Sequence, residues 1–289
     1  MTYFPDNIKT YPNMDTASPI HMSLNTLHAG YRAHRHDFLE FSYVVEGAGS
    51  ESINEAPHTM KPGTFTFVLP YQVHQIHTEP GSKLVLYNCM FSMDLLMEPS
   101  MQERMLGLID AGGAPSFAQL EGEERERMHA IVKDMYDEYR SNEPWRQTML
   151  QLRLKELLVL FDRHRRTQGA AASNSMQVEG RNYGRHASVW PIIHYIHLHY
   201  QDDLALSDLA ARFNMSVSRI SEVIKETTGQ NFLHFLHDLR IRHACSLLVS
   251  TEMSVAEIAL EVGYGSYNTF SRVFRETKGV VPKDYRKRK

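Results

Sequence analysis

The stretch VAEIALEVGYGSYNTFSRVFR, residues 255–275, decides the fold of the C-terminal third of this chain. It combines a short helical pattern of apolar residues, a turn that holds glycine, a serine and a second short helical pattern. The stretch LSDLAARFNMSVSRISEVIK, residues 206–225, has the same organisation with asparagine in the turn, and Leu209-Ala210 corresponds to Ile258-Ala259, 49 residues later. Each stretch predicts a helix-turn-helix, whose second helix can enter the major groove of DNA.

The second helix of each unit has a predicted start and a predicted buried face. Ser216 and Ser266 can cap these helices by accepting a backbone N–H, and Ser254 with Glu257 forms a capping box that starts the second unit. The apolar positions expected to point inward are Val217, Ile220, Val223 and Ile224 in the first unit and Phe270, Val273 and Phe274 in the second.

The outward positions of these two helices are the expected DNA contacts. They are Ser218, Arg219, Ser221, Glu222 and Lys225 in the first unit and Tyr267, Asn268, Ser271, Arg272 and Arg275 in the second. Arginine and asparagine can offer bidentate hydrogen bonds to guanine and adenine, while lysine and serine suit phosphates. Solvated faces of an all-helical domain are the alternative interpretation. Two units at a fixed spacing, with matching caps and basic outer faces, favour DNA.

Charge is divided unevenly along the 289 residues, whose net charge is −3. Residues 1–170 hold 16 Lys and Arg against 22 Asp and Glu, whereas residues 171–289 hold 15 against 12. This suits an acidic domain attached to a DNA-binding one. No apolar run is long enough for a bilayer and no secretory signal is visible, so we expect a cytoplasmic protein with no membrane partner. Cys89 and Cys245 are expected to be buried, reduced thiols.

The first part of the chain predicts a β-rich domain followed by helices. Runs at 38–45, 64–69 and 83–91 are rich in Val, Phe, Tyr and Leu and are separated by Gly and Pro, which indicates a sandwich or barrel. Residues 100–166 are expected to be helical. We therefore predict a domain over residues 1–166, a linker over 167–185 that is rich in Gly, Ala, Ser and Asn, and a second domain over 186–289.

An apolar stripe follows Pro144 in the predicted helical segment. Its members, at spacings of 4, 3, 4 and 3, are Leu150, Leu154, Leu157, Phe161 and His164. This spacing places them on one face of a helix. The stripe either packs on the β domain or forms part of a dimer seam.

The C-terminal region strongly resembles the AraC/XylS family of transcription regulators over about residues 186–289. The resemblance rests on several motifs: Asp208-Leu209-Ala210, Gly229, Leu239-Arg240, Ile258-Ala259, Val262-Gly263-Tyr264, Phe270-Ser271-Arg272-Val273-Phe274-Arg275, Gly279, Pro282 and Tyr285-Arg286. It implies a seven-helix domain in which a long helix, here about 232–249, joins the two units. It also implies recognition helices in successive major grooves, about 34 Å or 10 bp apart. The sequence departs from the family at Thr269, where an aromatic is usual, and at Ala205, where Ser or Thr is common.

The N-terminal region contains His34, His36 and Glu40 in the pattern H-x-H-x₃-E-x₆-G, with His74 on a later turn. This pattern resembles the first cupin motif, with an echo of the second, and is similar to the effector domains of carbohydrate-responsive AraC members. In metal-binding cupins the matching positions hold a divalent metal, and imidazoles with one carboxylate could hold Zn, Mn, Fe or Ni. The second motif is imperfect, because His74 falls one residue short of the usual spacing.

Three interpretations of these four residues remain open. They hold a metal, they line a pocket and hydrogen-bond the hydroxyls of a small polar ligand, or they are histidines satisfied by structural partners. His21, His28, His58 and His77 are expected on the surface or in loops and receive no role.

Taken together, the residues and the resemblance predict a two-domain α+β transcription regulator, not an enzyme. A cupin-like jelly-roll would bind a small-molecule effector, a sugar or sugar derivative, and an all-helical domain would bind promoter DNA. We expect an activator that works with RNA polymerase and forms a homodimer. The alternatives are a cupin whose metal is structural or catalytic, and an effector-independent regulator. No nucleophile elbow, P-loop, G-x-G-x-x-G or C-x-x-C motif is present.

Overall fold

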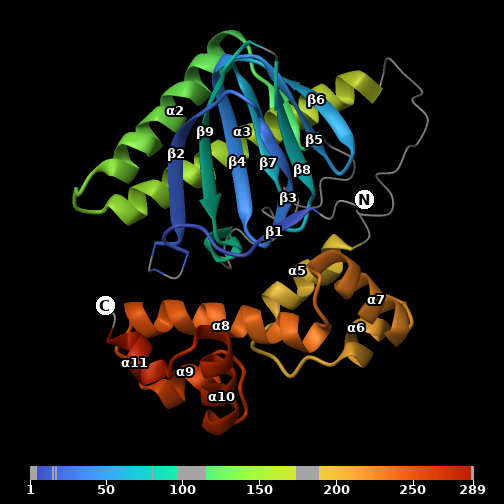
Figure 1. The fold of residues 1–289 in the computed structure, drawn as a ribbon, viewed down its shortest axis with the longest axis vertical. Coiled ribbons are helices and arrows are strands. Elements are labelled where there is room, and N and C mark those ends of the chain that lie inside the picture. Colours follow the sequence, from blue (N-terminus) through green and yellow to red (C-terminus); the bar gives the residue numbers. More distant parts are fainter. Residues whose placement is uncertain are drawn as a thin grey trace. The chain divides into compact units, whose positions relative to one another are not determined.

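The computed structural model describes residues 5–14, 16, 18–79, 81–96, 115–173 and 189–287 (Figure 1). The chain divides into two compact units. The first contains residues 1–14 and 20–180, and the second contains residues 181–289 with the short segment 15–19. The first unit is β-rich and the second is helical, as the sequence predicts.

Two five-stranded sheets form the jelly-roll of the first unit (Figure 1). One sheet has the order β1 (Asp6–Ile8), β3 (Tyr31–His36), β8 (His74–Thr78), β5 (Gly49–Ile53), β6 (Ala56–Met60). The other has the order β10 (Phe117–Gln119), β7 (Thr64–Val68), β4 (Leu39–Gly47), β9 (Leu84–Phe91), β2 (Ile20–Leu27). The strands expected at 38–45, 64–69 and 83–91 are β4, β7 and β9. A short 3₁₀ helix, η1 (Met93–Leu96), follows β9.

The second sheet has an aromatic face and a polar face because its strands alternate. Phe41 and Phe65 stack at 5.1 Å on the aromatic face, and Phe65 lies 5.0 Å from Phe161 of the helix α3 (Arg146–Ser173). The helix α2 (Gly122–Arg140) is tied to the same face by a hydrogen bond from the Tyr43 hydroxyl to the Arg125 carbonyl. The opposite face, which carries Glu40 and Ser42, therefore lines the barrel interior.

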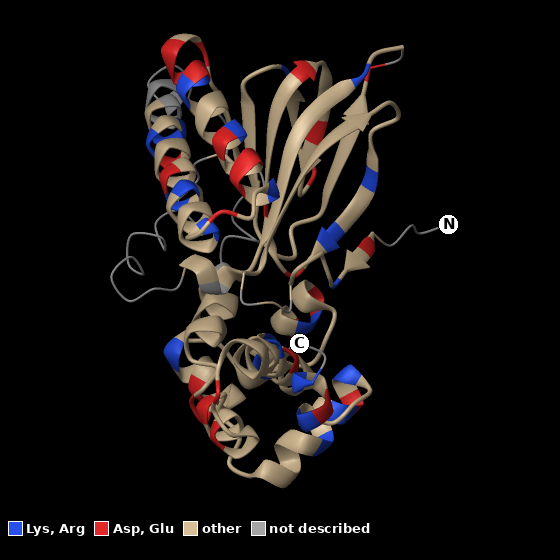
Figure 2. Cartoon of the chain, turned by 90° about the vertical axis from the view of Figure 1, so that its left-hand side faces the viewer, with Lys and Arg blue, Asp and Glu red and all other residues tan. Residues whose placement is uncertain are grey.

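One end of the interior is apolar. Val44, Met60, Ile76, Leu84 and Leu86 form a buried cluster there, packed by Leu27. Buried polar side chains, most of them histidine, serine, threonine or asparagine, occupy the neighbouring positions. Charged residues are fewer on the strands than on α2 and α3, as Figure 2 shows. Because burying polar groups costs free energy unless they find partners, this polar interior needs an explanation beyond folding.

The apolar stripe of α3 packs on the β domain. Leu150, Leu154, Leu157 and Phe161 are at most 1 % exposed within the single chain, so the stripe is not the dimer seam. His164 at its end pairs with Glu124 of α2, with Nδ1 2.7 Å from the carboxylate.

Two boundaries differ from the sequence prediction. α3 continues to Ser173, so residues 167–173 of the expected linker are helical. Alanines at 170–172 account for this, because alanine has the highest helix propensity. Residues 174–185 of that linker lie outside the described residues. The segment 100–166, which was expected to be helical, begins its described part with the strand β10, which pairs with β7.

Seven helices make up the described part of the second unit, in agreement with the family pattern. They are α5 (Trp190–Leu198), α6 (Leu206–Arg212), α7 (Val217–Thr228), α8 (Phe232–Ser250), α9 (Val255–Glu261), α10 (Tyr267–Lys278) and α11 (Pro282–Arg286). The long helix expected near 232–249 is α8. Its Arg240 donates hydrogen bonds to the carbonyls of Tyr200 and Asp202 and so anchors the segment after α5.

The caps and turns of the two helix-turn-helix units form as expected. The hydroxyls of Ser216 and Ser266 accept backbone N–H groups at 3.2 Å, and Ser254 with Glu257 forms both bonds of the capping box. Asn214 and Gly263 occupy equivalent turn positions with φ of 51° and 87°. Asparagine and glycine are the residues that tolerate this left-handed region best, which explains their presence.

Val217 departs from the expected pattern, whereas Ala205 lacks a side-chain cap as the sequence indicates. Val217 is 46 % exposed, so its predicted inward position is wrong, because it is the first residue of α7 and precedes the buried turn. Ala205 has no side-chain acceptor, and the start of α6 keeps only the reciprocal bond, from the Ala205 N–H to the Asp208 carboxylate at 3.2 Å.

Both cysteines, Cys89 and Cys245, are buried, and neither forms a disulfide within the described residues, as predicted. Among the described residues, no helix is both long and apolar enough to span a membrane.

Replacing Gly263 with alanine should destabilise the second unit. A Cβ at this position would lie 2.5 Å from the Gln201 carbonyl oxygen, and the residue would hold a strained φ. We expect a loss of about 1–3 kcal/mol, measured by denaturant unfolding and by faster hydrogen exchange in peptides from 255–278 of the full chain. Gly265→Ala is the matched control, because its Cβ would meet nothing within 4 Å. Equal effects of the two substitutions would contradict this account of the turn.

Candidate functional site

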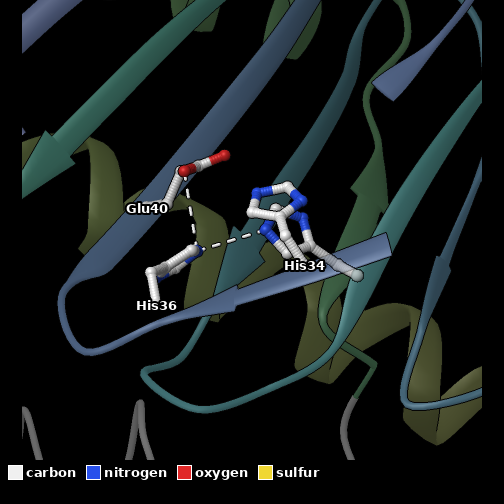
Figure 3. A group of neighbouring side chains, drawn as sticks. His34, His36 and Glu40 are labelled. Carbon is white, nitrogen blue, oxygen red and sulfur yellow. Dashed lines mark hydrogen bonds and ion pairs between the residues drawn. The ribbon is translucent and has the colours of Figure 1, made fainter. Parts of the chain in front are cut away.

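Four buried residues predicted from the sequence meet at one end of the barrel interior. His34 and His36 come from β3, His74 lies opposite His34 on β8, and Glu40 comes from β4 in the other sheet. One ligand atom from each lies within 4.8 Å of the others. The His36 and His74 Nε2 atoms are 3.2 Å apart, and His36 Nε2 is 3.6 Å from a Glu40 oxygen. Figure 3 shows His34, His36 and Glu40 side by side on the consecutive strands β3 and β4, which belong to different sheets.

Each imidazole is held in place through its Nδ1 atom. His34 Nδ1 lies 2.9 Å from the Arg32 carbonyl oxygen, and His36 Nδ1 lies 2.8 Å from that of Phe38. His74 Nδ1 lies 3.1 Å from a Glu51 oxygen. Because a carbonyl or an ionised carboxylate can only accept, all three Nδ1 atoms donate. The orientation of the rings is therefore fixed by the chain itself.

Two carboxylates of the interior have different environments. Glu40 accepts a hydrogen bond from the Asn88 amide at 2.8 Å. Glu51 lies between two histidines, 3.1 Å from His74 and 3.4 Å from His58. His58 also contacts the Thr66 hydroxyl at 3.2 Å and stacks on the Phe117 ring. Glu51 thus connects the four-residue cluster to His58 and, through it, to Thr66.

Burial dominates the ionisation of this cluster. Desolvation, with the neighbouring His74, lowers the pKa of His34 to about 4 and that of His36 well below its usual value. Burial raises the pKa of Glu40, although His74 and the Asn88 hydrogen bond act against it. Burial opposes ionisation of Glu51 too, but hydrogen bonds from His58 and His74 hold its pKa at about 2. Burial alone would lower the pKa of His74, but Glu51 and Glu40 raise it.

Sequence reasoning missed several polar residues of the interior. Ser42 pairs with Asn88 and with Thr66 in the strand register, which places the three in a row across one face of the sheet. Ser42 Oγ and Asn88 Oδ1 are buried and have no hydrogen-bond partner among the described residues. Alternation from Glu40 would have found Ser42, because residues i and i+2 of a strand share a face.

His58 corrects an expectation. It was predicted at the surface or in a loop, but it is 7 % exposed and lies in β6 beside Glu51. The strand segment APHTM contains a proline, which hides the alternation that turns His58 and Met60 inward. His77 on β8 is exposed, as expected.

The outward residues of α7 and α10 lie where the sequence predicts them. Ser218, Arg219, Glu222, Lys225, Tyr267, Asn268, Arg272 and Arg275 are exposed, and Ser221 and Ser271 are half-buried. Lys225 and Arg275 occupy equivalent positions, as do Ser221 and Ser271. Glu222 of α7 is replaced by Arg272 in α10, so the two helices present opposite charges at that position.

Carboxylates pair with Arg219 of α7 and with Arg272 of α10. Arg219 donates to Glu222 at 2.6 Å, and Arg272 donates to Glu276 at 3.0 and 3.2 Å. All four side chains are more than half exposed. Exposed pairs of this kind contribute about 0–1 kcal/mol, so DNA can displace them at little cost.

Helix α8 fixes the spacing between the two units. Its 19 residues span about 28 Å at ~1.5 Å per residue. Successive major grooves on one face of B-DNA lie about 34 Å apart. In the chain, α7 precedes α8, and α9 and α10 follow it, so α8 joins the two helix-turn-helix units.

Comparisons with known proteins identify the class to which these two units belong. A family model described as a helix-turn-helix domain matches residues 209–288, and one described as an AraC-like ligand binding domain matches residues 25–100. Together they cover more than half of the chain. The class is that of DNA-binding transcription regulators with a ligand-binding domain. Within it, the chain belongs to the AraC family.

Relatives and solved structures extend over much of the chain. The HTH-type transcriptional activator RhaS of Enterobacter sp. (strain 638) is 27% identical over 93% of this chain and 92% of its own length. The activator RhaR of Mannheimia succiniciproducens is 23% identical over 94% and 92%. The structure of ToxT from Vibrio cholerae is 12% identical over 93% of this chain and 98% of its own, with a TM-score of 0.41. The C-terminal domain of AraT from Geobacillus stearothermophilus is 36% identical over 38% and 89%, with a TM-score of 0.35.

Replacing Arg272 with alanine should weaken specific DNA binding. If its guanidinium contacts a base edge, the loss is about 1–3 kcal/mol, and discrimination at one position of the site relaxes. The measurement is the affinity for a site selected from random double-stranded DNA, compared with single-base variants of that site. Lys278→Ala, near the end of the same helix, is the control for simple loss of positive charge. Unchanged footprints for the Arg272 variant would remove it from the contacts that read sequence.

Proposed function

We propose that this regulator is a transcription activator that is switched by a polyhydroxylated small molecule, a sugar or sugar derivative, bound inside the barrel. His34, His36, Glu40 and His74 are the proposed effector contacts, and the row that includes Ser42 and Asn88 extends them. One observation carries this proposal. The barrel interior buries hydrogen-bonding groups beside the apolar end cluster, and Ser42 Oγ and Asn88 Oδ1 there have no hydrogen-bond partner in the described part of the chain.

The chemistry of this interior favours sugars over apolar ligands. Hydroxyl groups can donate to carboxylates and carbonyl oxygens and accept from amides and imidazoles. Glu40, Asn88 and Ser42 offer both kinds of partner within two neighbouring rows of one sheet. A small concave site with a few fixed polar groups is the usual form of a small-molecule pocket. An apolar effector would leave these polar groups unpaired, at a cost of about 1–3 kcal/mol each.

The proposed DNA contacts are the outward residues of α7 and α10. Because their chemistry differs, with Glu222 and Arg272 at one equivalent position, each helix should read a different groove segment. Their order is fixed by the chain, so the half-site is directional and not palindromic. Arg219, Tyr267 and Asn268 add further differences between the two helices.

Further partners follow from the same proposal. The relatives RhaS and RhaR carry the name of transcriptional activators, which supports an activator here and hence RNA polymerase as a partner. We also propose a homodimer that acts in the cytoplasm, where the chromosomal target lies. The effector would act by binding one arrangement of the protein more tightly than another, since only differential affinity can shift such an equilibrium.

Replacing Glu40 with alanine should abolish the effector response and leave DNA binding intact. The substitution removes a buried acceptor from the pocket and lies in the other unit from the recognition helices. The effector is first found by thermal shift with a sugar panel, since a ligand at 100 times its Kd adds about 2.7 kcal/mol. Effector-dependent transcription and half-site affinity are then measured for the variant.

Glu46→Ala is the matched control for this substitution. Glu46 lies on the same strand, but its side chain is exposed and pairs with Lys83 at 3.1 Å. It should respond to effector as the unaltered chain does. A full response in the Glu40 variant would refute the pocket, and a panel without any stabilising ligand would favour an effector-independent regulator.

A further inference from the structure

The cluster at the end of the barrel has the construction of a metal centre. We propose that His34, His36, His74 and Glu40 bind one divalent first-row transition-metal ion through three imidazole nitrogens and one carboxylate oxygen. The donors are all buried, come from three strands, and lie within 4.8 Å of one another. Imidazole and carboxylate ligands suit Zn, Fe, Ni or Mn, whereas Mg and Ca prefer sites made of oxygen alone.

The orientation of the rings is the first argument. Each Nδ1 donates to a carbonyl or carboxylate oxygen, so the neutral ring carries its lone pair on Nε2. A histidine that binds metal almost always donates its other ring nitrogen in this way, which fixes the tautomer and the ring orientation. All three histidines of the cluster have the same tautomer and point the Nε2 lone pair into the cluster. Stability of the barrel does not require this arrangement.

The contact between His36 and His74 is the second argument. Their Nε2 atoms are 3.2 Å apart, and with both Nδ1 atoms donating, two lone pairs face each other. A Glu40 oxygen, also an acceptor, lies 3.6 Å from the same His36 atom. A shared proton can bridge two of these three atoms, but a divalent cation can bind all three at once.

The spacing of the donors is the third argument. Ligands about 2.1 Å from a tetrahedral zinc ion lie ~3.4 Å from one another. The separations of 3.2 Å and 3.6 Å around His36 Nε2 agree with this value. His34 is the fourth donor and lies next to His74; the centroids of these two rings are 4.1 Å apart.

Glu51 is a positioning residue of this centre. It holds His74 Nδ1 at 3.1 Å and is itself held by His58. Outer carboxylates of this kind raise the basicity of the ligating ring and keep its orientation, and their loss commonly lowers metal affinity 10–100-fold. Glu51 touches no other member of the metal set in the described contacts, so its effect on the ion would pass through His74.

The ion would also contribute to effector binding. Asn88 contacts Glu40 and lies beside Ser42, so the proposed pocket row starts at the metal ligands. A metal ion binds hydroxyl oxygens well, and vicinal hydroxyls of a sugar could coordinate it. This last step rests on the proposed function, whereas the metal site itself does not.

The test uses the full chain, without an affinity tag, after removal of metals by a chelator. Titration with Co²⁺, Ni²⁺ or Zn²⁺, followed by calorimetry and by the visible spectrum of Co²⁺, should give one ion per chain with micromolar or tighter affinity. Mg²⁺ serves as the negative control. Absence of stoichiometric binding by all three transition metals would overturn the proposal, and the His36–His74 contact would then be a shared proton.

Variants locate the ion within the barrel. Glu40→Gln keeps an acceptor for Asn88 but loses the charged ligand. Glu51→Ala removes the acceptor that holds His74 Nδ1. Each substitution should lower the affinity for Co²⁺ at least tenfold. His77→Ala is the matched control, an exposed histidine on the same strand as His74, and should bind Co²⁺ normally. Circular dichroism shows whether each variant is folded. Unchanged affinity in both glutamate variants would place the ion elsewhere and refute this site.

Ser42→Ala separates the metal from the proposed function. It lies outside the four ligands, so it should bind Co²⁺ normally, and it should respond to the sugar effector less well. If metal binds but no effector changes transcription, the metal site stands and the effector proposal fails. If effector responses persist in the metal-free protein at full strength, the metal has no part in sensing.

Discussion

The strand alternation of the second sheet is the constraint on which the first unit depends. It sends Phe41 and Phe65 toward α3 and sends Glu40 and Ser42 into the barrel. The aromatic face supplies the core that holds α2 and α3, and the barrel is therefore free to be polar at one end. A slip of one residue in the register of β4 would exchange these two faces, burying carboxylates against the helices. Helix packing and the proposed effector pocket thus use opposite faces of the same strands, and substitutions on one face need not disturb the other.

The second unit contains two copies of one motif, and the positions that match and those that differ between the copies also lie on opposite faces of the helices. The buried positions, caps and turn residues of α6–α7 and α9–α10 match closely, down to the left-handed Asn214 and Gly263. The outward positions diverge, most clearly where Glu222 stands in one copy and Arg272 in the other. The positions that build a helix-turn-helix therefore match between the two copies, whereas the outward positions, which are the proposed DNA contacts, differ. Exposed ion pairs such as Arg272–Glu276 contribute little to stability, so they present a small energetic cost to any new partner of the arginine.

Local sequence patterns predicted much of the fold. Features that depend on pairing between distant parts of the chain could not be predicted. Caps, turn residues and helical periodicity are local, so Ser216, Ser254 and Ser266 could be assigned from neighbouring residues alone. His34, His36, Glu40 and His74 could be grouped because the motif spacing resembles a known family. Glu51, His58 and Asn88 were missed because their roles depend on which strands are neighbours, and no local pattern encodes that pairing. The α3 stripe was correctly placed on a helix, but only tertiary packing decides that it meets a sheet and not a second chain.

The central claim is that one chain reads two successive grooves in a fixed order. It can be tested by attaching a DNA-cleaving iron chelate to Val217→Cys or Thr269→Cys, at the start of α7 and α10; Cys89 and Cys245 are buried and should not be labelled. On a half-site selected from random DNA, the account predicts two cleavage centres about 10 bp apart, always in the same order. Coincident centres, or both orders at equal frequency on one site, would contradict it.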